Sequence, residues 1–366
     1  MRKIEKLINE LCPNGIEKLL MKEVANVSIG EFIHKNKQND SFPYPVYNGG
    51  ISNTGYYEEY NNEGKKVLIS ARGANAGFVN KIEGRYWAGN SCYSISVKDE
   101  SKLDWNYLYY YMKNNESKLL DKQQTGSIPS ISKKQIEEFK VFVPPLEVQR
   151  EIVNILDELT AYTSELTSKL TLEITTHQKQ YEYYRDTLVN KEKNKYLSDI
   201  LKIKNGKDYK SFGEGKIPVY GSGGIITYTS KFAYDKPSVL IPRKGSIDKL
   251  YYVEEPFWNV DTIFYTEIDE TLVMPKYVFY CLENEHLEEL NTAGGVPSLT
   301  QSVLNNVQIY VPSLDEQKEV VNKLDDLSSL VTAISKELLI EIEARKKQYE
   351  YYRDKLLSFK EVKVNE

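Results

Sequence analysis

The sequence is poor in the features that mark secreted, membrane-spanning and metal-binding proteins. Its 3 cysteines are Cys12, Cys92 and Cys281, and an odd number of widely spaced cysteines supports neither a disulfide framework nor a CxxC metal site. We therefore expect reduced, packed thiols. No apolar run approaches the ~20 residues that cross a bilayer, and the opening "MRKIEKLINELCPNG" is charged where a signal peptide would be apolar. These absences predict a cytoplasmic protein without a membrane partner.

Catalytic motifs are lacking as well. The chain has no GxxxxGK[ST] phosphate loop, no GxGxxG after a strand, no HExxH and no GxSxG. Its "VPPL" string lacks the polar and aromatic residues of the N/DPP[YF] motif found in amino-methylating enzymes. The 3 histidines, His34, His177 and His286, are far apart, and we interpret them as structural or solvated. The sequence therefore predicts a non-catalytic chain, with no catalytic residue and no metal ligand.

The net charge of −5 hides a strong segregation of charge along the chain. Residues 191–249 hold 13 Lys or Arg against 6 Asp or Glu, whereas residues 250–310 hold 1 against 10. The opposite charge balance of these two neighbouring segments predicts a domain with one cationic side, which is a feature of nucleic-acid binders. Residues 1–145 hold 20 Lys or Arg against 17 Asp or Glu, so a cationic surface on the first domain would have to come from local clusters.

An internal repeat organises the whole chain. A shift of 168 residues aligns 126–189 with 294–357 without a gap, with 25 identities in 64 positions, including two copies of "KQYEYYRD". Upstream the match is weaker: "YPVYNGG" resembles "IPVYGSGG", and "VLISARG" resembles "VLIPRKG". Each half is thus one variable globular part followed by one well-matched helical part.

The variable parts contain short β-type runs punctuated by Gly, Asn, Asp and Pro, with one helical stretch each, at 104–120 and 274–290. We therefore predict an α+β fold with two similar mixed α/β domains, each followed by a long helix. The expected boundaries are 1–145 for the first globular domain, 146–190 for the central helix, 191–313 for the second globular domain, and 314–366 for the last helix and tail.

The helical parts, 146–189 and 314–357, contain no Gly or Pro, and their apolar residues recur in steps of four and three, which predicts a coiled coil. An extra step of four, at Ile174 and Ile342, predicts a shared stutter that unwinds the supercoil. We expect the two helices to pack antiparallel about a pseudo-twofold axis. The predicted seam includes Leu156, Leu159, Leu166, Leu170, Tyr181, Tyr184, Leu324, Leu327, Ile334, Leu338, Tyr349 and Tyr352. Tyr183 and Tyr351 point elsewhere, and we expect them in a protein contact.

Two globular parts, closed by "GSIPS…VPPLEVQREI" and "GGVPS…VPSLDEQKEV" and followed by helices that end in "KQYEYYRD", resemble the specificity subunit of a type I restriction-modification system. The resemblance covers essentially the whole chain. It implies that each domain reads one half of a split site in double-stranded DNA, and that the helices set the distance between the halves. It also implies two docked methyltransferase (modification) subunits, joined by restriction/translocase subunits. S-adenosylmethionine, ATP and Mg would belong to those partners, so this chain would hold no cofactor.

Lys and Arg side chains can neutralise phosphates and read base edges, and small hydroxyl residues allow close approach to phosphate. The candidate DNA-binding residues are Arg72, Asn75, Lys81, Arg85, Ser127 and Ser130 in the first domain, and Lys202, Lys204, Lys207, Lys210, Arg243, Lys244, Lys249 and Ser298 in the second. Each could instead be a solvated charge or part of an ordinary turn.

Two other functions stay open on the sequence alone. The chain could be a coiled-coil adaptor whose globular ends bind proteins, which predicts no salt-dependent binding to duplex DNA. It could also be a DNA-modifying enzyme that uses unrecognised residues, which predicts turnover without partners.

Overall fold

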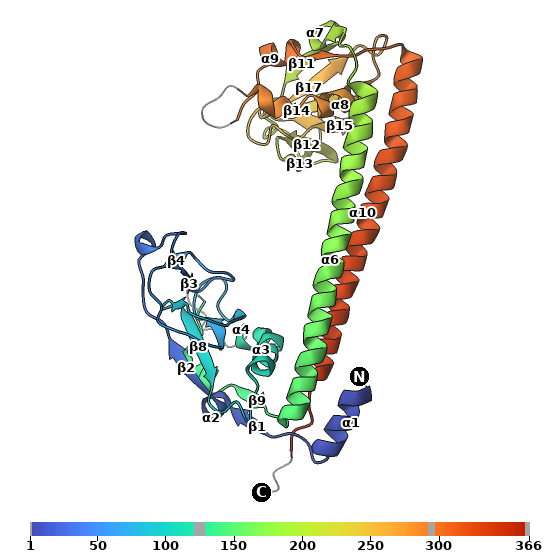
Figure 1. The fold of residues 1–366 in the computed structure, drawn as a ribbon. Helices are drawn as coiled ribbons and strands as arrows, with labels where there is room; N and C mark the ends of the chain where they lie inside the picture. Colours follow the sequence, from blue (N-terminus) through green and yellow to red (C-terminus); the bar gives the residue numbers. More distant parts are fainter. Residues whose placement is uncertain (1, 121–128, 292–296, 363–366) are drawn as a thin grey trace. The chain divides into compact units, whose positions relative to one another are not determined.

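The structure is a computed structural model that describes residues 2–120, 129–291 and 297–362 (Figure 1). The chain divides into two compact units, one formed by Met1–Ser168 with Glu341–Glu366 and the other by Lys169–Ile340. Each unit therefore contains one globular domain and one part of each long helix.

The globular part of the first unit is a mixed α/β domain whose main sheet has the strand order β2-β8-β5-β6. A smaller sheet has the order β4-β3-β7, and β1 pairs with β9. The helix α3 packs on β5 and β6. The elements are α1 (Arg2–Leu11), β1 (Lys18–Leu20), α2 (Met21–Val24), β2 (Ala25–Ile29), η1 (Lys35–Lys37), β3 (Tyr44–Tyr47), β4 (Tyr56–Tyr57), β5 (Lys66–Ser70), β6 (Val79–Ile82), β7 (Trp87–Ala88), β8 (Cys92–Val97), α3 (Trp105–Asn114), α4 (Glu116–Leu120), α5 (Lys133–Glu137) and β9 (Lys140–Phe142).

The globular part of the second unit repeats this plan. Its main sheet has the order β11-β17-β14-β15, a smaller sheet has the order β13-β12-β16, and β10 pairs with β18. The helix α8 packs on β14 and β15. The elements are β10 (Lys195–Tyr196), α7 (Leu197–Ile200), β11 (Leu201–Asn205), β12 (Ile217–Gly221), β13 (Gly224–Thr229), β14 (Ser238–Pro242), β15 (Tyr251–Val253), β16 (Trp258–Asn259), β17 (Ile263–Ile268), α8 (Pro275–Asn284), η2 (Leu287–Leu290), α9 (Gln301–Asn305) and β18 (Gln308–Ile309).

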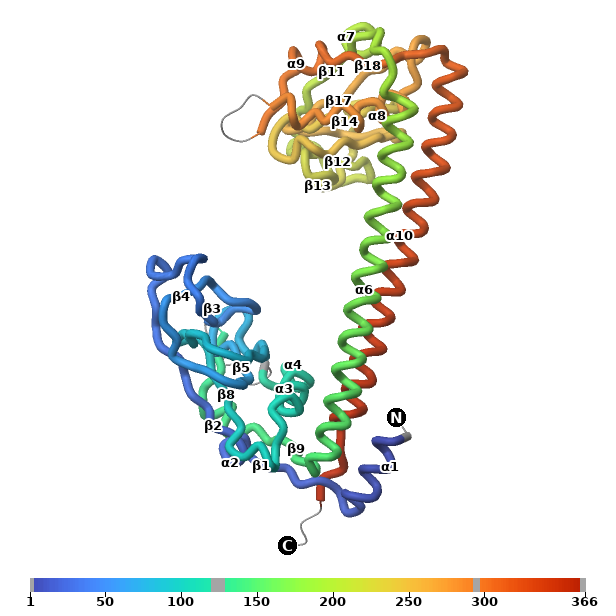
Figure 2. The backbone as a smooth tube through the Cα atoms, viewed as in Figure 1, coloured from blue at the N-terminus to red at the C-terminus, as the bar shows by residue number. Residues whose placement is uncertain are grey.

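Two long helices, α6 (Leu146–Val189) and α10 (Leu314–Leu356), pack together (Figure 2). In the first unit the Thr160 hydroxyl lies 3.1 Å from the Tyr349 hydroxyl, and in the second unit the side chain of Tyr181 lies next to that of Ser328. Residue numbers rise along one helix while they fall along the other, so the pair is antiparallel. The predicted fold class, two mixed domains each followed by a long helix, is confirmed.

Burial along α10 follows the predicted seam through its stutter, since Leu324, Ile334, Leu338 and Tyr349 are all at least partly buried and Ile342 is buried. The same holds along α6 from Ile152 to Tyr181. The other seam residues, which are Leu156, Leu159, Leu166, Leu170, Leu327 and Tyr352, are also buried or partly buried.

Tyr184 departs from this pattern, and its assignment to the buried seam is wrong. Its side chain is 48% exposed, whereas the next residue, Arg185, is 8% exposed. Arg185 turns toward α8, where its Nη1 lies 3.8 Å from Oε2 of Glu283. The domain packs against this end of α6, so the buried face shifts by one residue. Burial also raises the pKa of Glu283, although Arg185 opposes the shift.

Each helix predicted inside a globular part is broken in the structure. In the first domain α3 ends at Asn114 and α4 begins at Glu116, and the side-chain amide of Asn115 donates back to the Tyr111 carbonyl at 2.7 Å. In the second domain α8 ends at Asn284, and His286 adopts a left-handed conformation with φ of 45° before η2. In the first domain a side-chain amide that bonds the backbone interrupts the helix, and in the second domain a left-handed residue does so.

A separate hydrophobic core fills each domain. Cys92 and Cys281 are buried and form no disulfide, and burial raises the pKa of both thiols to about 12. Among the described residues, no helix is long and apolar enough to cross a membrane. No group of three His, Cys, Asp or Glu within the same ranges could hold a metal ion.

Candidate nucleic-acid interface

A buried glutamine fixes each domain to the start of its long helix. Gln149, which is 0% exposed, accepts from the Asp104 N–H at 2.7 Å and donates to the carbonyls of Lys102 at 2.7 Å and Pro144 at 2.6 Å. Gln317, 168 residues later and also 0% exposed, makes the same three bonds, to the Met274 N–H and the carbonyls of Leu272 and Pro312. The identical glutamine in "VPPLEVQ" and "VPSLDEQ" was the sequence signal for this role, which sequence reasoning missed.

Tyrosine–aspartate bonds strengthen the same junction. The hydroxyl of Tyr110 on α3 donates to Asp157 on α6, and that of Tyr280 on α8 donates to Asp325 on α10. Burial and the nearby carboxylate raise the pKa of both tyrosines, so the hydroxyls remain donors. Each globular domain is thereby held on a rigid helix in a matching way.

Two basic loops occupy equivalent places in the two domains. The loop after β5 carries Arg72, which forms a β-bridge with Ser130, and the loop after β14 carries Lys244, which forms a β-bridge with Ser298. The glycine that follows each cation donates its N–H to a proline carbonyl, Gly73 to Pro129 at 3.0 Å and Gly245 to Pro297 at 3.1 Å. Both glycines have positive φ, 88° and 81°, which a side chain would strain.

The loops therefore bring together residues that are more than 50 positions apart in sequence. Arg72, Asn75 and Lys244 are exposed, while Arg243 is half-buried with its guanidinium carbon 5.6 Å from the centre of the Phe264 ring. Lys249 is exposed a few residues beyond Lys244. Ser127 lies outside the described residues. The structure thus places a cation and a serine side by side once in each domain.

The lysine-rich start of the second domain follows the edge strand β11 and the turn after it. Lys202, Lys207 and Lys210 are exposed, whereas Lys204 forms an ion pair of 3.4 Å with Glu267 on the adjacent strand β17. Lys193 likewise pairs with Glu285 at 2.5 Å. The expected single cationic side is therefore partly neutralised, because Glu267 on β17 and Glu285 after α8, both in the acidic segment, pair with lysines of the basic segment.

Two candidates of the first domain have local partners. Lys81 is half-buried, with its ammonium 2.9 Å from the Asn106 side-chain oxygen and 4.8 Å from the centre of the Tyr109 ring. Arg85 lies over the Tyr60 ring at 4.7 Å and 3.4 Å from Glu63. The environment of Lys81 fits a structural cation–π contact on α3, and Arg85 remains exposed.

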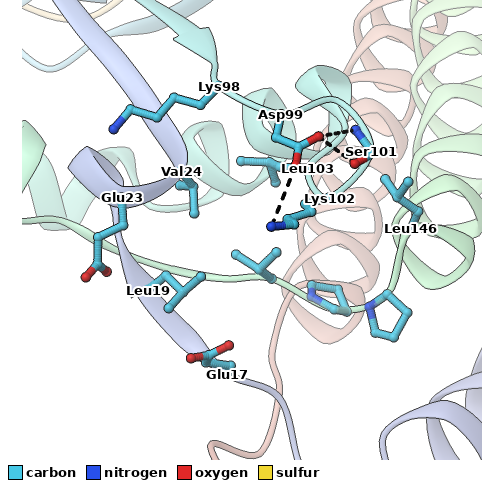
Figure 3. Close-up of a pocket in the computed structure, with 13 residues that line it drawn as sticks. Glu17, Leu19, Glu23, Val24, Lys98, Asp99, Ser101, Lys102, Leu103 and Leu146 are labelled. Atoms are coloured by element: carbon cyan, nitrogen blue, oxygen red, sulfur yellow. Dashed lines mark hydrogen bonds and ion pairs between the residues drawn. The ribbon is translucent and has the colours of Figure 1, made fainter.

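An open pocket of about 500 Å³ lies near the junction of the first domain with α6, between β1, the turn after β8 and the segment that enters α6 (Figure 3). Asp99 accepts from the N–H and the hydroxyl of Ser101 in that turn, and Lys98 and Glu23 are among the lining residues (Figure 3). A pocket of about 290 Å³ lies beside the corresponding turn of the second domain, lined by Ser198 and Asp269 among others. Neither pocket is lined by Arg72 or Lys244.

The fold and the two equivalent basic loops define a duplicated protein, in which each half contains the same arrangement once. The model of the type I restriction modification DNA specificity domain matches residues 13–176 and 190–344. The two matches cover most of the chain and coincide with the two halves of the repeat.

Individual relatives agree with the family model. A putative type I restriction enzyme specificity subunit of Haemophilus influenzae is 34% identical over 345 residues, which cover 86% of this chain and 88% of the relative. The specificity subunit of the EcoR124I/EcoR124II type I restriction enzyme of Escherichia coli is 30% identical over 306 residues, 72% of this chain and 73% of the relative. A putative type I specificity subunit of Mycoplasma pneumoniae is 26% identical and covers 93% of this chain and 96% of its own length.

Solved structures show the same fold. A chain from a study of complex assembly and conformational transition of the type I restriction-modification system matches with a TM-score of 0.74 at 15% identity, over 94% of this chain and 98% of its own. The chain belongs to the family of type I restriction-modification specificity subunits. It is the DNA specificity subunit of such a system and, by family, a non-catalytic one.

Proposed function

We propose that each globular domain reads one half of a bipartite target in double-stranded DNA, and that α6 and α10 set the distance between the halves. The observation that carries this proposal is the matching bridge of Arg72 to Ser130 and of Lys244 to Ser298. Cations at these two places would contact phosphates or guanine edges, and small residues beside them allow close backbone approach. The functional division is the one expected from the sequence, with domains at 1–145 and 191–313 and helices at 146–190 and 314–366.

The partner proteins in this proposal are two modification subunits, with restriction/translocase subunits joining them. Exposed apolar residues recur on the two long helices at the repeat distance of 168 residues, as Tyr162 and Leu330, Leu172 and Ile340, and Tyr183 and Tyr351. Tyr183 is 68% exposed and Tyr351 is 62% exposed. Two equivalent sets of apolar residues fit two copies of one partner, because identical subunits need equivalent surfaces.

The proposal assigns no cofactor to this chain. S-adenosylmethionine, ATP and Mg would be used by the modification and restriction subunits, as the family resemblance implies. The role of this chain is to position DNA and partners, which requires rigid junctions between domain and helix rather than catalytic groups. The buried Gln149 and Gln317 supply such junctions.

Selection of bound duplexes from a random pool tests the reading of two half-sites. The full chain, incubated with random duplex DNA at low salt, should enrich a split sequence with a constant gap. Variant Arg72→Ala should weaken selection of one half and Lys244→Ala selection of the other, whereas Lys98→Ala, away from both loops, should leave both halves unchanged. Enrichment of no split sequence would contradict the proposal.

Changing the length of the helices tests their role as a spacer. Equal insertions of four residues after Thr171 in α6 and after Leu339 in α10 lengthen both helices at equivalent repeat positions by about 6 Å. Since each base pair adds about 3.4 Å of duplex, the gap between selected half-sites should grow by one or two base pairs. A gap that stays constant while both half-sites are still selected would refute the spacer role.

A further inference from the structure

An exposed hairpin lies beside the basic loop of the second domain. The strands β12 and β13 form this hairpin, and β13 exposes Ile225 and Ile226, which are 50% and 55% exposed. Contiguous exposed apolar side chains, such as these two neighbours on one strand, are typical of contact surfaces. The hairpin has no assigned role in the reading of DNA proposed above.

A β-bulge directs one of these isoleucines. Val219 pairs with Thr227 and Tyr220 with Ile225, so Ile226 is an extra residue in β13 that has no partner on β12. A Cβ placed on Gly221 would lie 2.6 Å from Cδ1 of Ile226. The glycine therefore provides the space in which the Ile226 side chain lies, and bulges of this kind re-aim side chains at functional sites.

One threonine connects the hairpin to the basic loop. The Thr262 carbonyl accepts from the N–H groups of Arg243 at 2.8 Å and Lys244 at 3.3 Å. Its hydroxyl accepts from the Ser222 N–H, next to Gly221, at 3.3 Å. Ile226 therefore belongs to the same small surface as Lys244, the cation that is bridged to Ser298.

The first domain also exposes an isoleucine beside its basic loop, on a loop rather than on a bulged strand. The exposed Ile51 follows β3, the counterpart of β12, and is 59% exposed. The loop that carries it lies against the basic loop, because a Cβ on Gly49 would be 2.4 Å from the Arg72 carbonyl and the Ser70 hydroxyl donates to the Gly50 carbonyl at 3.0 Å. The Ser91 carbonyl accepts from the Ala71 N–H at 2.8 Å, as Thr262 does from Arg243.

We propose that Ile226 and Ile51 determine part of the sequence specificity, by contacting the methyl group of a thymine in the major groove of their respective half-sites. The inference rests on the proposed reading of DNA by each domain. An aliphatic side chain next to a cation matches a thymine methyl next to a phosphate, because the methyl is the apolar feature of the major-groove edge. The cations supply affinity for the half-site, and the isoleucines distinguish thymine from cytosine at one position.

Replacement of thymine by uracil tests this inference, since it removes only the methyl group. In the selected target, uracil at one thymine of the second half-site should weaken binding by the full chain about fourfold, the effect of one buried methyl. Variant Ile226→Ala should bind the thymine and uracil duplexes equally, and Ile51→Ala should do so for the first half-site. Gly221→Ala, which displaces Ile226 without removing it, should also lose the preference. Leu272→Ala, an exposed aliphatic change elsewhere in the domain, should keep it.

Several outcomes would overturn the inference. One is an Ile226→Ala variant that still prefers thymine over uracil fourfold, and another is a selected half-site without any thymine on either strand. In both cases a wild-type chain that still selects a split target leaves the proposed function intact. A wild-type chain that selects no split target contradicts the proposed function itself.

Discussion

Variant Gln149→Ala is expected to loosen the first domain from α6. The side chain is fully buried and makes three hydrogen bonds to backbone groups of Lys102, Asp104 and Pro144. Each such bond contributes about 1 kcal/mol net, so the loss should be about 3 kcal/mol before any cost of the cavity left behind. For a unit of this size that corresponds to a fall in melting temperature of roughly 6–12 °C.

Scanning calorimetry of the full chain, with hydrogen exchange to assign the transitions, measures this effect. Gln149→Ala should lower the transition of the first unit, and Gln317→Ala that of the second. Arg150→Ala and Lys318→Ala, exposed neighbours of the two glutamines, are the matched controls and should change neither transition. If Gln149→Ala lowers the free energy of unfolding of the first unit by less than about 1 kcal/mol, the reasoning that this side chain joins domain and helix is refuted.

Three further predictions concern charge and partner binding. Because burial raises the pKa of Glu283, the charged carboxylate destabilises the folded state above the ordinary carboxyl pKa. Glu283→Gln should therefore raise the melting temperature at pH 8 and not at pH 4. An equal change at both pH values would contradict this cause. The slope of log K for DNA binding against log salt concentration should fall in magnitude by about one for Arg72→Ala and for Lys244→Ala. An unchanged slope would exclude a phosphate contact. The double variant Tyr183→Ala with Tyr351→Ala should lose affinity for the modification subunits at an unchanged melting temperature, and full affinity would place the docking surface elsewhere.

The duplicated architecture is predictable from the sequence, because the repeat aligns without a gap. The long helices are predictable because their apolar residues keep a helical spacing along each segment. The helix bounds found, 146–189 and 314–356, differ from expectation by a single residue. Tyr184 shows the limit of such patterns. The apolar spacing along α6 does not show that Arg185 is buried against α8, since this burial depends on how the domain packs on the helix.

The candidate site is only partly predictable, for a similar reason. The alignment of "VLISARG" with "VLIPRKG" correctly places Arg72 and Lys244 at equivalent positions of the two domains, because similar sequences adopt similar backbones. Charge counts along the chain do not reveal that Lys204 faces Glu267, since strand pairing decides which distant residues meet. The bulge at Ile226 and its space over Gly221 likewise need the register of β12 and β13, which no short motif encodes.

Mapping of methylated adenines across the genome tests the central claim most directly. In the organism that carries this gene, deletion of the gene should abolish methylation at one split motif, and restoring the gene should restore it. Restoring it with Lys244→Ala should reduce methylation at that same motif. If every methylated motif persists after deletion while the gene is expressed in the parent, this chain does not direct modification to a bipartite site, and the account is contradicted.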